Sequence, residues 1–144
     1  MGLDMYLEGR KYLLSGRNDE VPTEDGFRLK EKILELGYWR KEPNLHGYIV
    51  KTFADGKDDC QDIELSVEDA QKIREAVRNR QLVETSGFFF GQSADPNSED
   101  PEERKWAEEF ERETIEIFDK AIAWVNDAKT DKTSMRWIVY RASW

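Results

Sequence analysis

The chain opens with an alternating stretch, Gly2-Leu3-Asp4-Met5-Tyr6-Leu7-Glu8. In an extended backbone its leucines and methionine share one side and its polar residues share the other, which is the period of a half-buried strand. Residues 133–144, at the other end of the chain, also alternate, but there apolar residues stand on both sides. A strand with two apolar faces is typical of the middle of a sheet or of a position under a helix. Each end of the chain therefore predicts a strand, and the last strand is expected to be central.

Three segments between these ends have helical features. Residues 43–53 begin with a proline, which suits a first helical turn, and then carry apolar residues at four-residue steps. Ser66-Val67-Glu68-Asp69 resembles a capping box with Asp in place of Glu at its fourth position. Residues 101–128 also begin with a proline and carry a broad apolar stripe that includes Trp106 and Phe110. This last segment predicts the longest helix.

The remaining strands are less regular. Residues 27–38 favour a strand in their later part, although their leucines also suit a helix, and residues 63–65 add a short extended piece. Residues 82–91 are rich in Phe and end between two glycines, which predicts a buried strand, whereas the polar residues 15–26 predict a loop or an open hairpin tip. Helices and strands that do not strictly alternate indicate an α+β domain. We expect a single domain, 1–144, with a mostly antiparallel sheet of about four strands and three helices packed on it, the longest about 101–128.

Composition excludes several classes of protein. With 144 residues, 37% of them charged and 12% aromatic, the chain suits one packed domain. No stretch approaches the 18 apolar residues of a membrane span, and no signal peptide is visible, so we expect a cytoplasmic protein without a membrane partner. Its only cysteine and histidine, Cys60 and His46, exclude a disulfide framework and a Cys/His zinc site. The acids of residues 55–62 do not have EF-hand spacing, so neither a metal nor a cofactor is predicted.

The net charge of −9 is unevenly distributed. Residues 95–116 hold ten acids and three bases, so this segment carries −7 and the other 122 residues carry only −2. Nucleic acid is not an expected partner, because no basic stripe is present to neutralise phosphates. The acidic segment is either a solvated helix face or a surface that steers a partner protein by charge.

The residues around Tyr38-Trp39-Arg40-Lys41 form the main candidate site. Together with Asn44 and His46 they place two bases, aromatic rings, an amide and an imidazole beside an expected helix start. Arginine can hold a phosphate in a two-pronged contact, helix amides favour anions, and aromatic rings can stack on a base. The full set of candidate ligand-binding residues is Tyr6, Trp39, Arg40, Lys41, Asn44, His46, Phe89, Arg136 and Arg141.

Each candidate also has a purely structural interpretation. The aromatic residues and His46 could belong to the core, Asn44 could be a turn residue, and Arg136 and Arg141 of the last strand could pair with acids. As the two arginines of an acid-free strand, they could instead form a second wall of an anion pocket or an edge used in self-association. No catalytic residue is predicted, although His46 is the natural acid or base if the protein is an enzyme.

Several landmarks resemble a family of small uncharacterised bacteriophage and prophage proteins. The opening Met1-Gly2-Leu3-Asp4-Met5-Tyr6-Leu7 is similar to the start of that family, as are Tyr38-Trp39-Arg40-Lys41 with Asn44 and His46, Gly87-Phe88-Phe89-Phe90-Gly91, and the closing Tyr140-Arg141-Ala142-Ser143-Trp144. Together they span nearly the whole chain. The resemblance implies a phage or prophage accessory protein that acts in the cytoplasm of a bacterial host cell.

Three functions follow as hypotheses. The first is binding and sequestration of a small anionic, nucleotide-type ligand in counter-defence, by a homo-oligomer with its pocket at a subunit interface. The second is inhibition of a host protein through the acidic helix. The third is hydrolysis or elimination of a nucleotide with His46 as acid or base and Arg40 or Lys41 stabilising phosphate charge.

Overall fold

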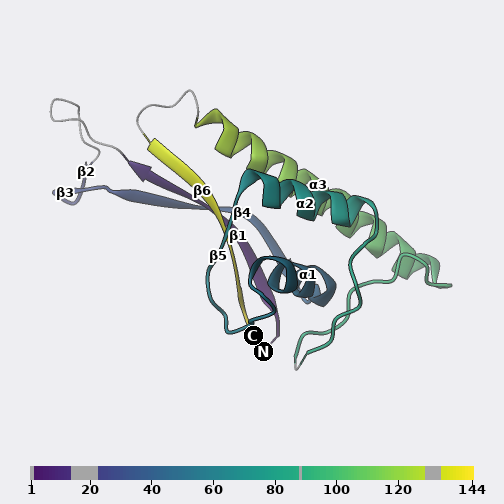
Figure 1. Ribbon diagram of the computed structural model, residues 1–144. Coiled ribbons are helices and arrows are strands. Elements are labelled where there is room, and N and C mark those ends of the chain that lie inside the picture. Colours follow the sequence, from purple (N-terminus) through teal and green to yellow (C-terminus); the bar gives the residue numbers. More distant parts are fainter. Residues whose placement is uncertain (1, 14–22, 88, 129–133) are drawn as a thin grey trace.

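The computed structural model describes residues 2–13, 23–87, 89–128 and 134–144, and Figure 1 shows its ribbon. Residues 15–22 of the expected loop or hairpin tip at 15–26, together with Phe88 and Thr133 of the two predicted strands, lie outside the described residues. In chain order the elements are β1 (Asp4–Leu13), β2 (Thr23–Glu24), β3 (Phe27–Arg28), β4 (Glu31–Arg40), α1 (Pro43–Phe53), β5 (Ile63–Leu65), α2 (Val67–Arg78), α3 (Pro101–Asp127) and β6 (Ser134–Ser143).

The main sheet has four antiparallel strands in the order β4-β1-β6-β5, and β2 and β3 form a separate two-stranded sheet. The first and last strands of the chain pair along their full length, with Asp4 opposite Ser143 and Leu13 opposite Ser134. The alternating pattern at each end of the sequence is thus confirmed, and the last strand is interior as expected. Residues 27–38 resolve as strand, since β4 occupies most of this segment and pairs with β1.

All three helices cover the same face of this sheet (Figure 1). The side chains of Leu3, Met5 and Leu7 are fully buried beneath them, as the alternation predicts. The helix α3 lies close to β4 because Gly37 has no side chain: a β-carbon there would stand 2.5 Å from Ile117 Cγ2. The α+β single domain is confirmed, with helices near their expected bounds and the capping box of α2 formed by Ser66 and Asp69.

The predicted strand at 82–91 is wrong. No described residue of that segment is in a strand, and Val83 is 71% exposed. The segment instead crosses α1 as part of the connection between α2 and α3. Asn44 Oδ1 accepts a hydrogen bond from the Thr85 amide at 2.9 Å, and Gly47 leaves room for Thr85, whose Oγ1 would be 2.3 Å from a β-carbon at position 47. Its backbone is bound to a side chain rather than to a neighbouring strand.

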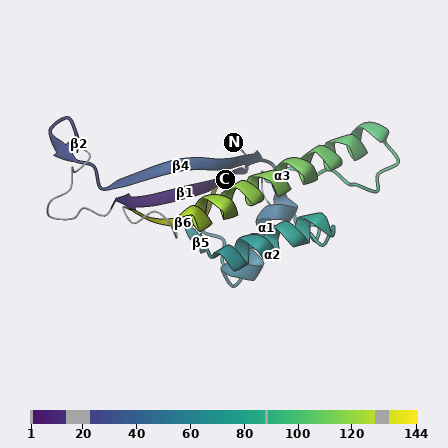
Figure 2. The ribbon, with the colours of Figure 1, turned by 90° about the horizontal axis from the view of Figure 1, so that it is seen from above.

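The apolar stripe of α3 is only partly buried. Its later part packs on the sheet and Phe118 is fully buried, but Trp106 is 54% exposed. Figure 2 gives the reason, because the first turns of α3 extend beyond the end of the sheet. A stripe predicted from periodicity alone does not reveal where its covering layer ends. No helix among the described residues is long and apolar enough to cross a membrane.

Candidate functional site

Arg40 and Lys41 lie at the junction of β4 and α1, beside the start of the chain. A β-carbon placed on Gly2 would be 3.1 Å from Lys41 Cε, 3.5 Å from Arg40 Nη2 and 3.8 Å from the carbonyl oxygen of Phe89. Lys41 adopts a left-handed backbone, with φ of 54°, and its amide donates to the Leu3 carbonyl at 2.8 Å. Three of the predicted site residues therefore meet at one point, where two cationic side chains stand next to each other.

This pair of cations is poorly neutralised by the protein. The Arg40 side chain is 52% exposed, and its Nη1 is 3.6 Å from Asp4 Oδ1. The same Asp4 oxygen accepts a hydrogen bond of 2.5 Å from the Tyr38 hydroxyl, and this bond raises the pKa of Tyr38. Among the described parts of the chain, Lys41 forms no ion pair. By contrast, Arg74 is bound to Asp119 at 2.8 Å.

Tyr6 and Arg141 lie together on the face of the sheet that the helices leave open. They are directly opposite each other in the β1–β6 register, and the Arg141 guanidinium lies 5.0 Å from the Tyr6 ring centre. The Tyr38 ring is 5.3 Å from the Tyr6 ring on the other side. Arg141 donates to Glu8 Oε1 at 2.6 Å, so its charge is already paired. Tyr6 and Tyr38 thus form an aromatic surface on the same face as Arg40.

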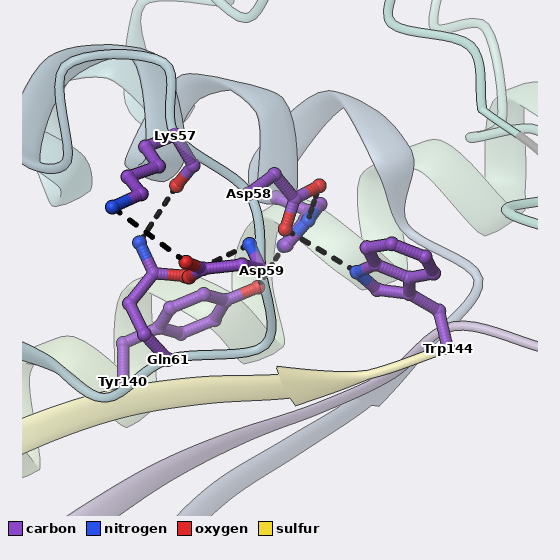
Figure 3. A network of polar contacts seen from close by, with 7 residues as sticks. Lys57, Asp58, Asp59, Gln61, Tyr140 and Trp144 are labelled. Carbon is purple, nitrogen blue, oxygen red and sulfur yellow. Dashed lines mark hydrogen bonds and ion pairs between the residues drawn. The ribbon is translucent and has the colours of Figure 1, made fainter.

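His46 is a buried structural residue. It is 2% exposed, and both of its ring nitrogens are occupied: Nδ1 is 2.7 Å from the Tyr140 hydroxyl and Nε2 is 2.8 Å from Asp58 Oδ2. Trp144 Nε1 donates to the other Asp58 oxygen at 3.2 Å (Figure 3). Burial and, to a lesser extent, the charge of Asp58 raise the pKa of Tyr140 well above its usual value. The interpretation of His46 as a ligand-binding residue is therefore not supported by its position.

The loop that supplies Asp58 is shaped by its own polar contacts. The Gln61 side chain donates to the Lys57 carbonyl at 2.6 Å and accepts from the Asp59 amide at 3.1 Å (Figure 3). These bonds hold the loop between α1 and β5 in a tight turn that directs Asp58 toward His46. Three acids of the segment 55–62 have structural partners: Asp58 is paired with His46, Asp59 with Lys57 and Asp62 with Arg10. Among the described residues, no group of three His, Cys, Asp or Glu side chains is arranged to hold a metal ion.

Three other predicted residues have structural partners. Trp39 is on the covered face, where its Nε1 donates to Thr114 Oγ1 at 2.9 Å and its ring stacks on Phe118. Arg136 lies over Trp124 at 5.1 Å and donates to that residue's carbonyl at 2.9 Å. Asn44 binds the connection between α2 and α3 through two hydrogen bonds. Its side-chain Oδ1 accepts from the Thr85 backbone amide, and its own backbone amide donates to Ser93 Oγ.

The expected second wall of an anion pocket does not form, because Arg136 and Arg141 are five positions apart in one strand. An odd separation places two side chains on opposite faces of a sheet. Nor does the start of α1 offer free amides as expected. Its cap position is Glu42, an acid, and the Asn44 amide is bound to Ser93.

A feature that the sequence analysis missed is a groove of about 260 Å³ between the end of β4 and the first half of α3. Tyr38 and Arg40 line one wall, and Trp106, Glu109 and Glu113 line the other. The spacing of the three α3 residues places them on one helix face, a pattern visible in the sequence. That β4 lies opposite them is decided by tertiary packing alone.

Glu42 also lines this groove. Its Oε2 is buried and has no hydrogen-bond partner among the residues that the structure describes. Burial raises the pKa of this carboxyl from 4.5 to about 7, while a hydrogen bond with Ser93 acts weakly in the opposite direction.

Comparisons of the chain with protein-family models, curated proteins and solved structures give no significant match.

Proposed function

We propose that this protein binds a small anionic ligand at Arg40 and Lys41. The observation that supports the proposal is the juxtaposition of these two cations at Gly2, with Lys41 lacking an ion pair among the described residues. Two adjacent positive charges repel each other, and a bound anion removes that cost while making charge-assisted hydrogen bonds with both. By contrast, Arg74 and Arg141 already have carboxylate partners at short distance.

The class of ligand follows from the neighbouring rings. Tyr38 is 44% exposed and lies two residues before Arg40 on the same face of β4, beside Tyr6. A nucleotide held by its phosphates at Arg40 and Lys41 could stack its base on this aromatic surface. The cavity beside Asn44, at about 70 Å³, is too small for a nucleotide, because ligand pockets measure roughly 300–1,000 Å³. The ligand would therefore lie on an open surface that a second copy of the chain could complete.

The biological setting rests on the resemblance to phage and prophage proteins. In that setting, a protein that sequesters a nucleotide-type signal would act as a counter-defence accessory in the host cytoplasm. A host-protein inhibitor that acts through α3 is a second function, favoured by the exposure of Trp106 on the acidic half of that helix. The geometry gives no support to a nucleotide hydrolase or lyase that uses His46, because both ring nitrogens of this buried side chain already have protein partners.

Calorimetric titration with mononucleotides, linear and cyclic dinucleotides and inorganic phosphate tests the first function. Arg40→Gln and Lys41→Gln should each weaken the binding of the best ligand about tenfold or more, as expected for loss of one charge-assisted contact. Lys72→Gln removes the same charge from an exposed position on α2 and should change the affinity less than twofold. The proposal fails if no compound in the panel binds, or if the α2 variant loses as much affinity as the other two.

A further inference from the structure

The groove between β4 and α3 shares Tyr38 and Arg40 with the candidate anion site, but its α3 wall is acidic. Its exposed rings, Tyr38 and Trp106, belong to different elements and line the same space. Large aromatic residues that remain exposed and line a common concave surface are typical of the centre of a protein interface. A volume of about 260 Å³ is below the usual range for a small-molecule pocket, so it suits one long side chain of a partner.

The charge of the groove determines what kind of side chain it can accept. Among the described residues that line the groove there are three acids and one basic residue: Glu42, Glu109 and Glu113 against Arg40. The rings complement this charge, because a cation is attracted to the face of Tyr or Trp as well as to carboxylates. A negatively charged group would be repelled by the same wall.

Glu42 provides independent support for a cationic occupant. Its buried Oε2 has no hydrogen-bond partner in the described parts of the chain, and leaving a buried carboxylate oxygen unpaired is unfavourable. Because Glu42 lines the groove, a cation bound there would favour the ionised form of its carboxyl, which burial disfavours. A buried polar group without a partner in a folded protein calls for an explanation, and a role in function is one such explanation.

We propose that this groove binds the side chain of an arginine or lysine within a basic segment of a partner protein. The inference rests on the protein-binding function proposed for α3 and names its partner class; it does not depend on the anion site. The rest of α3 extends the complementarity, because residues 95–116 carry a net charge of −7 that attracts a basic segment before the side chain enters the groove.

Binding of a nine-residue amidated peptide with three arginines, measured by fluorescence anisotropy at physiological salt, tests this inference. The same peptide with citrulline in place of arginine keeps the shape and removes the charge. The arginine peptide should bind at least tenfold more tightly than the citrulline peptide. Trp106→Ala and Glu113→Gln should each weaken the arginine peptide at least fivefold.

Matched controls separate the groove from the general acidity of α3. Glu108→Gln removes the same charge from an exposed position outside the groove, and Phe27→Ala removes an exposed ring from β3. Both should bind the arginine peptide within twofold of the unaltered protein. If Glu108→Gln is as damaging as Glu113→Gln, α3 binds by diffuse charge and the groove inference is wrong while the second function stands. If the arginine peptide does not bind, both are wrong.

The pH dependence of peptide binding provides a further check. The charged residues that line the groove with Glu42 are Arg40 from β4 and Glu109 and Glu113 from α3, and a hydrogen bond with Ser93 acts on Glu42 itself. The peptide should bind more tightly as pH rises from 6 to 8, with a proton released on binding, and Glu42→Gln should abolish most of that change. Self-association of the free protein that Trp106→Ala removes would identify a second copy as the occupant and overturn the proposed partner class.

Discussion

Replacing Glu42 with glutamine should change the pH dependence of stability. Compared with the unaltered chain, the variant should gain free energy of unfolding as pH rises. Burial raises the pKa of this carboxyl from 4.5 to about 7, so the folded state holds its proton more tightly than the unfolded state. The contribution of Glu42 to stability is therefore fully present below pH 4.5. It is lost as pH rises through about 7, because the folded protein must then bury a charged carboxylate. Glutamine has the shape of the neutral acid and does not ionise.

The size of the effect follows from the two pKa values. A difference of one pKa unit between the folded and unfolded states corresponds to about 1.4 kcal/mol in the free energy of unfolding. Most of the interval between the unfolded pKa of 4.5 and the folded pKa of about 7 lies between pH 5 and pH 8. The gain in unfolding free energy from Glu42→Gln should therefore be larger at pH 8 than at pH 5 by about 2.5 kcal/mol. Any constant cost of the glutamine amide cancels in this difference.

Urea denaturation of the two proteins at pH 5, 6, 7 and 8 measures this quantity directly. Glu108→Gln serves as the control, because it removes the same charge from an exposed position on α3 and leaves the buried carboxylate in place. Parallel stability curves for Glu42→Gln and the unaltered protein across this pH range would refute the reasoning. Such a result would mean that the carboxylate of Glu42 is not desolvated in the folded protein.

Two further predictions concern packing. Gly47→Ala should lower the melting temperature, because the added β-carbon would be 2.3 Å from Thr85 Oγ1 and overpacking costs about 1–3 kcal/mol. This cost exceeds the gain of about 1 kcal/mol that alanine usually gives a helix over glycine. Adding Thr85→Gly should restore the melting temperature, and a lack of rescue would contradict this contact. Thr114→Val should lower the free energy of unfolding, measured by urea denaturation, by about 1–3 kcal/mol, because it leaves Trp39 Nε1 buried without an acceptor. Trp39→Phe should then lower it by less in the Thr114→Val background than in the unaltered protein. Strictly additive losses would argue against the hydrogen bond.

The candidate site could be predicted only in part. The local order of residues 38–46 placed two bases together, and the structure keeps Arg40 and Lys41 adjacent. The same stretch placed Trp39 and His46 with them, but a strand sends Trp39 to the opposite face from Arg40, and His46 turns inward on α1. The alternation rule already separates Trp39 from Arg40. Only the packing of α1 on β6 determines that Tyr140 and Asp58 surround His46.

The sequence by itself determined the elements with regular periods: the alternation in β1 and β6, the four-residue steps of α1, and the capped start of α2. These patterns are local, because each depends on which side of one strand or helix a residue lies. The tertiary structure alone decided that the Phe-rich segment crosses α1, that α3 extends past the sheet, and that Trp106 therefore faces Tyr38 across an acidic groove. Which surfaces meet depends on where one layer ends over another, and no periodicity within a single element contains that information.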